Sequence, residues 1–286
     1  MSHLDCVTTQ RKPVLRDAVY GAVIGDALGV PFEGRGRGTF RCTGMSGYGT
    51  YNMPAGTWSD DSSLILATCR SLKENGGKIV LSDISDKFRQ WYRDGRFTPF
   101  GVTFGCGRAT SDAIELGKAR SDDRSCGNGS LMRILPLAYV NSTDDEIRAV
   151  SAITHAHPIA QETCVIYVNI IKRMRKKDGI ALREIVHGLH LPAPFDRLSY
   201  IDSLPESEIR STGYVVDSLE AALWCVLTSE GYEECLLKAV NLGGDTDTVA
   251  SLAGGLGAAV KYAPDSMKAE WIHTLQNREL IEDCLF

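Results

Sequence analysis

Apolar residues recur along most of this 286-residue chain at helical intervals, and the two-residue alternation of a β-strand is nearly absent. Such spacing places the apolar side chains on one face of an α-helix. The clearest example is residues 14–30, which follow Pro13, a residue that suits the first turn of a helix. We therefore expect an all-α fold: a single compact multi-helix domain over residues 1–286, in which residues 1–12 form a flexible N-terminal segment.

Further predicted helices share this periodicity. They cover residues 60–73, 82–93, 108–117, 130–140, 144–155, 158–175, 212–227, 232–242, 246–262 and 265–275. Ser59 and Thr143 suit N-cap positions, because their hydroxyls can accept a backbone N–H. Two segments lack the pattern. Residues 191–209, rich in Pro and Ser, predict a connection, whereas the glycine-rich residues 34–56 predict either an ordered functional loop or a mobile lid.

The charge balance argues against several classes of protein. The formal net charge is −5 without a long run of either sign, whereas a nucleic-acid-binding domain usually carries a basic stripe. The one basic cluster, residues 172–177, suits the last turn of a helix. No stretch approaches the roughly 18 apolar residues of a membrane-spanning helix, and the polar residues 1–12 do not resemble a signal peptide.

The cysteines indicate a reducing compartment. All nine are scattered along the chain and none forms a CxxC pair, which argues against zinc and against a disulfide framework. Free thiols of this kind are typical of cytosolic proteins. We therefore expect a cytoplasmic protein. We further expect a monomer, with neither a membrane nor a nucleic acid as its partner.

Two acidic clusters open predicted helices. They are Ser59-Asp60-Asp61-Ser62 and Gly243-Gly244-Asp245-Thr246-Asp247-Thr248. A helix N-terminus stabilises a carboxylate by only ~0.3–1 kcal/mol, which is too little to hold four of them in one buried cleft, whereas a divalent cation is enough. Oxygen ligands alone favour Mg²⁺ or Mn²⁺ over zinc. For either cluster by itself, an ordinary helix cap is the alternative interpretation.

Five motifs, these two among them, resemble those of the ADP-ribosylglycohydrolase family and occur in the order found there. They are Gly25-Asp26-Ala27-Leu28-Gly29 with Glu33, Ser59-Asp60-Asp61-Ser62, Gly127-Asn128-Gly129-Ser130-Leu131-Met132-Arg133, Thr154-His155, and Gly243 to Thr248. Together they span residues 21–257, most of the chain. The resemblance implies a hydrolase that removes ADP-ribose from a modified acceptor.

The resemblance also implies a dinuclear metal site between helix N-termini. Two divalent cations, Mg²⁺ or Mn²⁺, would be held by Ser59, Asp60, Asp61, Asp245, Asp247 and Thr248. The chain departs from many members at Ser59 and Ser62, where those carry Thr. Both residue types offer a hydroxyl oxygen, so we expect the site to be retained.

Glu33 is the residue that the resemblance assigns to acid–base chemistry beside the metals. It lies between Phe32 and Gly34, where a partly apolar wall would raise its pKa toward the working range. The alternative is a solvated loop carboxylate. Asp26 lies among small apolar residues, so it needs hydrogen-bond partners, and we expect a structural role for it rather than direct metal ligation.

Substrate contacts are implied for the remaining motifs. Gly127, Asn128, Gly129 and Ser130 would cradle the diphosphate in a turn that opens a helix, and His155 would contact the ligand. For the turn, an ordinary tight turn is the alternative. Aromatic residues near the motifs are candidates for stacking on adenine, without an assignment among them: Phe32, Tyr48, Tyr51, Trp58 and Phe104.

The acceptor is the open part of the functional prediction. ADP-ribosyl-arginine on a protein is the expected substrate, with serine, O-acetyl-ADP-ribose, another small ADP-ribose conjugate or a nucleic-acid linkage as alternatives. Two rival functions use the same fold. One is a catalytically weak ADP-ribose-binding or toxin-neutralising (immunity) protein, and the other is a structural protein in which the metals staple two helices.

Overall fold

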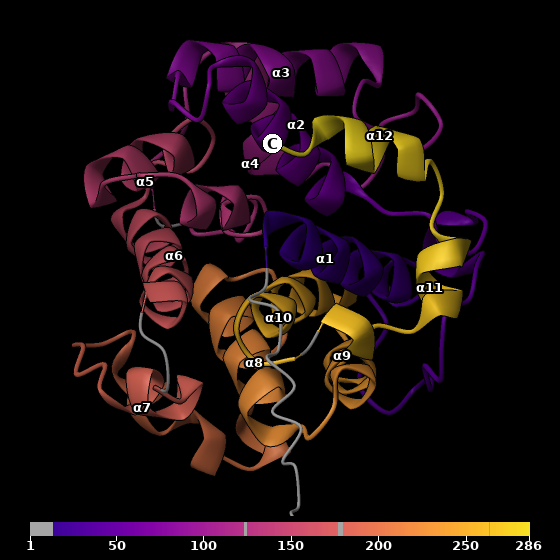
Figure 1. The fold of residues 1–286 in the computed structure, drawn as a ribbon, viewed down its shortest axis with the longest axis vertical. Coiled ribbons are helices and arrows are strands. Elements are labelled where there is room, and N and C mark those ends of the chain that lie inside the picture. Colours follow the sequence, from indigo (N-terminus) through magenta and orange to yellow (C-terminus); the bar gives the residue numbers. More distant parts are fainter. Residues whose placement is uncertain (1–13, 123–124, 177–179, 263) are drawn as a thin grey trace, which may run out of the picture.

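Two helices with scarcely any polar face lie side by side at the centre of the molecule, α1 (Leu15–Gly29) and α10 (Thr246–Val260) (Figure 1). The structure is a computed structural model, and it describes residues 14–122, 125–176, 180–262 and 264–286. Every residue of α1 except Arg16 is buried, and every residue of α10 except Val260. A helix buried on all sides belongs in the core of a larger domain, and the other helices surround this pair.

Glycine lets these two helices approach each other closely. A Cβ on Gly21 would overlap the Gly254 carbonyl oxygen and lie 2.7 Å from the Cβ of Ala258. One turn further along α1, a Cβ on Gly25 would overlap the Ala250 carbonyl. The next turn brings Gly29 against the backbone of Asp247. The helices are therefore antiparallel, and the C-terminus of α1 meets the N-terminus of α10.

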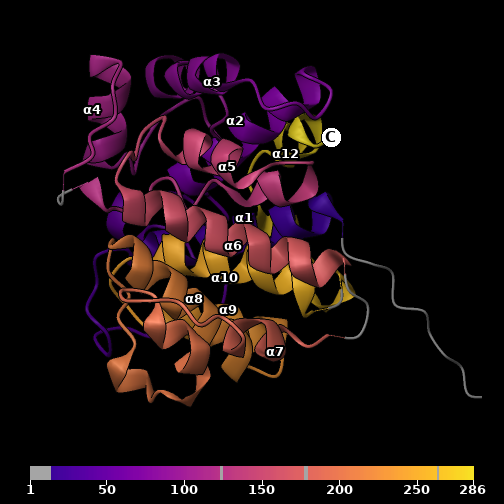
Figure 2. The same ribbon diagram turned by 90° about the vertical axis from the view of Figure 1, so that its left-hand side faces the viewer.

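The remaining helices form two groups about this pair. Above α1 in Figure 1, α2 packs against α3 and α12, while α8 and α9 pack against α10 below it. Figure 2 shows α6 running alongside α10. The bounds are α2 Asp60–Glu74, α3 Leu81–Asp94, α4 Arg108–Leu116, α5 Asp144–Ser151, α6 Pro158–Lys176, α7 Leu182–His187, α8 Val215–Thr228, α9 Tyr232–Asn241, α11 Ala269–Thr274 and α12 Arg278–Cys284.

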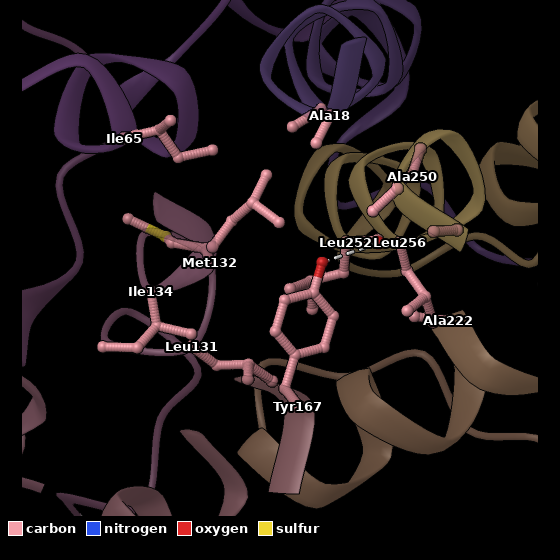
Figure 3. Packing of buried hydrophobic residues seen from close by; sticks show 14 of the residues in the cluster. Ala18, Ile65, Leu131, Met132, Ile134, Tyr167, Ala222, Ala250, Leu252 and Leu256 are labelled. Carbon is pink, nitrogen blue, oxygen red and sulfur yellow. Dashed lines mark hydrogen bonds between the residues drawn. The ribbon is translucent and has the colours of Figure 1, made fainter. Parts of the chain in front are cut away.

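One continuous apolar core joins these helices. Figure 3 shows Ile65 of α2 near Met132, Ala18 of α1 on the same side of the core, and Tyr167 of α6 reaching toward α10. The Tyr167 hydroxyl donates to the Leu252 carbonyl at 3.1 Å, so the one polar group of that side chain is satisfied inside the core. The core thus ties α6 to the central pair.

The all-α prediction is confirmed, and the described residues contain isolated β-bridges but no strand. Most predicted helices appear within a few residues of their expected bounds, and Ser59 and Thr143 are N-caps whose hydroxyls accept backbone N–H groups. The described helices include none that is long and apolar enough to cross a membrane. Residues 1–12, predicted to form a flexible segment, lie outside the described part of the chain.

Three helix predictions need correction. The helix predicted over residues 130–140 is wrong: turns lead into a short 3₁₀ helix, Leu135–Tyr139. Pro136 has no N–H for the α-helical bond to Met132 and disfavours the α conformation at the preceding residue. The helix predicted over residues 265–275 is two pieces, Pro264–Ser266 and α11. The helix expected from residue 212 begins at Val215.

Elsewhere the structure adds short elements. Helices α7 and α12 were not predicted, because six or seven residues are too few to show a helical period. The predicted connection, residues 191–209, contains two 3₁₀ helices, Asp196–Ser203 and Glu206–Glu208. There are two more 3₁₀ helices. Val30–Phe32 precedes the glycine-rich loop, and Gly49–Tyr51 lies inside it.

Because α1 and α10 are in close contact at Gly21, we predict that Gly21→Ala lowers the free energy of unfolding. Alanine favours helix over glycine by ~0.5–1 kcal/mol, but overpacking against the Gly254 carbonyl and Ala258 costs about 1–3 kcal/mol. Urea denaturation would show a lower midpoint. Gly36→Ala is the control, because its Cβ would meet only Thr39 Cγ2 at 3.5 Å. Equal midpoints for both variants would contradict the close-contact interpretation.

Candidate active site

Residues from all five sequence motifs meet in one cavity of about 320 Å³. It opens where α1 ends and where α2 and α10 begin. Carboxylates line one part of it, and backbone-rich turns line another. The lining residues are Glu33, Asp60, Asp61, Gly105, Gly107, Arg108, Ala109, Thr110, Gly127, Asn128, Gly129, Met132, His155, Gly213, Asp245, Asp247 and Thr248.

The loop that carries Glu33 is fastened to the glycine turn before α10. The N–H of Gly34 donates to the Gly244 carbonyl at 2.8 Å, and the N–H of Gly244 donates to the Arg35 carbonyl at 2.8 Å. Gly244 has a φ of +71°, and a Cβ there would overlap the Ser211 carbonyl, so only glycine fits. These bonds hold Glu33 beside Asp245.

Arg37 extends this fastening. Its guanidinium donates to the carbonyls of Leu242, Glu206 and Ile209, at 2.9, 2.7 and 2.6 Å. Further along the loop, the side chain of Asn241 exchanges two hydrogen bonds with the backbone of Cys42. Of the two predictions for residues 34–56, the structure therefore matches the ordered loop at its first half.

Asp26 caps the start of α2 from the neighbouring helix. Its carboxylate accepts hydrogen bonds from the Ser59 N–H at 3.0 Å, the Ser62 N–H at 3.0 Å and the Ser62 hydroxyl at 2.5 Å. Burial raises its pKa to about 6, although these hydrogen bonds lower it. Asp26 therefore orients the N-terminus of α2 and does not line the cavity.

Carboxylates from the start of α2, from the start of α10 and from the Glu33 loop lie close together. Ligand oxygens of Glu33, Asp245 and Asp247 all lie within 4.8 Å of one another. Asp61 of α2 accepts a hydrogen bond from the Thr248 hydroxyl of α10 at 3.3 Å. Burial raises the pKa values of Asp61 and Asp247 well above the usual range, and the neighbouring negative charges raise them further. Asp60 is shifted in the same way.

This cluster has the features of a divalent metal site. Within the described residues, none of its five carboxylates forms an ion pair with Lys or Arg. Two buried oxygens in it, Asp61 Oδ1 and Glu33 Oε2, have no hydrogen-bond partner in the structure. Buried unpaired carboxylates are costly, and oxygens alone are the donor set of Mg²⁺ or Mn²⁺. The residues present therefore fit such ions.

Ser59, the remaining predicted ligand, does not line the cavity. Its side chain is buried, and its hydroxyl lies 3.5 Å from Asp61 Oδ2. Gly105 closes the same corner, because a Cβ there would press on the Asp60 carboxylate. Sequence reasoning did not identify Gly105 or Gly107, although two glycines just before a predicted helix were a usable signal.

Tyr51 lies beside Glu33, a neighbour that the sequence did not indicate, and its ring packs on Phe104 with 5.0 Å between centroids. Burial raises the pKa of Glu33, the nearby hydroxyl of Tyr51 opposes this shift, and the charge of Asp245 adds to it. No local pattern links residues 33 and 51. None of the five aromatic residues considered for adenine stacking lines the cavity.

The turn at Gly127 to Gly129 forms part of the opposite wall. The Asn128 N–H donates to the Gly213 carbonyl at 3.0 Å, while its side-chain amide donates to Asp245 at 2.7 Å and to Ser218 at 2.8 Å. Asn128 therefore positions a carboxylate of the cluster. The expectation that this turn opens an α-helix is wrong, since turns and a 3₁₀ helix follow it.

Ser130 and His155 are placed differently from each other. Ser130 is fully buried outside the cavity, with its hydroxyl 2.8 Å from that of Ser151. His155 lines the cavity with its ring against Gly129, where a Cβ would lie 2.7 Å from the imidazole Cε1. Burial lowers the pKa of His155 to about 3, and the charge of Arg133 lowers it further, so the ring is neutral.

Comparisons with known proteins identify the family. A model of the ADP-ribosylglycohydrolase family matches residues 8–285. The ADP-ribosylarginine hydrolase Tri1 of Pseudomonas putida is 30% identical over 273 residues, which cover 90% of this chain and 72% of that protein. The ADP-ribosyl-dinitrogen reductase glycohydrolase of Rhodospirillum rubrum is 28% identical, with coverage of 90% and 88%.

A solved structure shares the fold as well. It is an ADP-ribosylglycohydrolase-related protein complex, which superposes with a TM-score of 0.77 at 31% identity and covers 94% of each chain. The family match extends over nearly the whole chain, and the relatives named above are hydrolytic enzymes. The chain therefore belongs to the ADP-ribosylglycohydrolase family and is a hydrolase.

Proposed function

We propose that this enzyme releases ADP-ribose from modified arginine side chains of proteins, with two divalent cations, Mg²⁺ or Mn²⁺, in its site. The observation that carries the proposal is the five-carboxylate cluster with two buried, unpartnered oxygens at the cavity wall. The cations would be held by Asp60 and Asp61 from the start of α2, with the Ser59 hydroxyl beside Asp61, and by Asp245, Asp247 and Thr248 from the start of α10.

The charge of the cavity supports an arginine acceptor. Two divalent cations neutralise four of the five carboxylate charges, so the metal cluster itself keeps one negative charge, whereas Arg108 on the lining is exposed and lies 3.8 Å from Asp112. A guanidinium group is cationic, whereas serine and acetyl acceptors are neutral, and complementary charge favours the correct partner. The names of two relatives support the same choice, since the enzymes of Pseudomonas putida and Serratia proteamaculans are ADP-ribosylarginine hydrolases.

Glu33 is the proposed acid–base residue. When bound, the cations supply Lewis-acid chemistry for orienting ribose hydroxyls and activating water. Glu33, with the Tyr51 hydroxyl beside it, accepts a proton from the attacking water and returns it to the leaving guanidine nitrogen. Water adds to the anomeric carbon as the C–N bond breaks, through an oxocarbenium-like state. The products are ADP-ribose and the unmodified arginine side chain.

The opposite wall is proposed to hold the rest of the substrate. Gly127, Asn128, Gly129 and His155 line the cavity and are proposed to contact the diphosphate, although the Asn128 N–H itself is donated to the Gly213 carbonyl. Ser130 would take part through the backbone of the turn, because its hydroxyl points elsewhere. The described cysteines are all free, which supports work in the cytoplasm, and we take the enzyme to be a monomer.

Removing one carboxylate is predicted to weaken metal binding. Calorimetric titration with MnCl₂ is expected to show tight binding to the wild type and at least a tenfold loss of affinity in Asp61→Asn, because Asp61 has an unpartnered buried oxygen at the cavity. Asp94→Asn is the control, since Asp94 is exposed at the end of α3. Mn²⁺ should raise the melting temperature of the wild type and the control only. Equal affinities for all three proteins would contradict the metal site.

Glu33→Gln is predicted to lower kcat by about 10²–10⁴, because it removes the group that transfers the proton. Tyr51→Phe, which removes only the hydroxyl beside Glu33, should cause a smaller loss. The measurement is release of free ADP-ribose from arginine-, serine- and O-acetyl-linked substrates with saturating Mg²⁺. Release from arginine alone is expected. Tight binding of ADP-ribose without release from any linkage would favour a binding or immunity protein instead.

A further inference from the structure

Arg133 is a cation in the apolar core, and the part of the chain that the structure describes gives it no acidic partner. Its side chain is fully buried, its guanidinium lies 4.4 Å from the centre of the Phe88 ring, and its Nε has no hydrogen-bond partner. Burial lowers its pKa to about 10, which leaves it charged at neutral pH. An arginine in such a place is costly, so a compensating function is expected of it.

The buried guanidinium is linked to the cavity through one hydroxyl. Nη2 of Arg133 donates to Thr154 Oγ1 at 2.8 Å, and Thr154 Oγ1 lies 2.8 Å from Nδ1 of His155. Its other hydrogen bonds go to the Val150 carbonyl, at 3.3 Å. Arg133 is therefore connected to His155, which lines the cavity, only through Thr154.

Hydrogen-bond chemistry determines the direction of this relay. Arginine can only donate, so Thr154 must accept from it. A hydroxyl has a single hydrogen, and within the described residues the hydroxyl of Thr154 has no acceptor other than His155 Nδ1. Thr154 therefore donates to Nδ1, and the ring proton of the neutral His155 must be on Nε2. The charge of Arg133 favours the same arrangement, because it lies on the Nδ1 side of the ring.

We propose that Arg133, acting through Thr154, fixes His155 as the neutral tautomer with its proton on Nε2, and so keeps an N–H donor on the cavity wall for an oxygen of the ADP-ribose part of the substrate. That the oxygen belongs to ADP-ribose rests on the proposed function, whereas the tautomer of His155 does not. Arg133 and Thr154 are positioning residues, and His155 is the residue that touches the substrate.

The surroundings of His155 support a donor at this place. A Cβ on Gly127 would lie 3.5 Å from Nε2, and one on Gly129 would lie 3.1 Å from it, so the two glycines leave this nitrogen accessible. Five carboxylates line the same cavity. In such an acidic cavity a phosphate or ribose oxygen needs donors, and a neutral imidazole with Nε2–H supplies one without acting as a base.

The tautomer can be measured directly in the intact protein. Long-range ¹H–¹⁵N correlation spectra of histidine-labelled enzyme distinguish the two neutral tautomers, and His155→Gln identifies the signal among the six histidines. We expect a single Nε2–H tautomer in the wild type and in Thr154→Ser, which keeps the hydroxyl. Thr154→Val, which removes it, should show a mixture or the Nδ1–H form. A wild-type signal with the proton on Nδ1 would overturn the proposal.

Binding separates positioning from a merely structural role. Calorimetry with free ADP-ribose is expected to show about tenfold weaker binding for Thr154→Val and nearly normal binding for Thr154→Ser. In turnover, Thr154→Val should raise KM and leave kcat nearly unchanged. A lower melting temperature with unchanged tautomer and unchanged binding would overturn the relay. If no linkage is hydrolysed, the proposed function fails, but the spectra still decide the tautomer.

Discussion

The close antiparallel contact between α1 and α10 is the constraint on which the rest of the structure depends. Glycines at three successive turns of α1 let its backbone approach α10, and the last of them, Gly29, rests against Asp247. Because the helices meet end to start, Asp26 and Glu33 at one end are brought to Asp247 and its neighbours at the other. A larger side chain between the helices would separate the carboxylates, so the packing of the core and the chemistry of the cavity are one requirement.

The cavity divides its chemistry between two walls. One wall gathers carboxylates whose mutual repulsion and burial raise their pKa values, and such a wall is stable only beside positive charge. The rest of the lining includes glycine backbone and a neutral imidazole, which offer hydrogen bonds without charge, and the exposed side chain of Arg108. Asn128 joins the walls through its bond to Asp245. Cations and the oxygen-rich substrate can therefore be held by separate surfaces of one pocket.

Much of the fold and part of the site could be predicted from the sequence, for a common reason: both leave local patterns. Helical periodicity identified the long helices, and the acidic pairs at helix starts identified α2 and α10 as carriers of chemistry. The helix over residues 130–140 failed because apolar spacing took precedence over Pro136, whose missing N–H breaks the α-helix. The position of Tyr51 beside Glu33 and the burial of the Ser130 hydroxyl left no signal, because each depends on contacts between distant segments.

The paired hydrogen bonds between the Glu33 loop and the glycine turn, together with Arg37, have a further consequence. They end at residue 37, and the next attachments are the ring of Phe40, stacked on Phe32 with 4.7 Å between centroids, and the bonds of Cys42 to Asn241. The residues between, Gly38 and Thr39, are exposed. Strain or added length in that short span is absorbed before it reaches Glu33, because both ends are anchored. Insertions there would be tolerated as they are at a loop tip, which makes residues 38 and 39 a place where the enzyme can gain a new surface without disturbing its carboxylates.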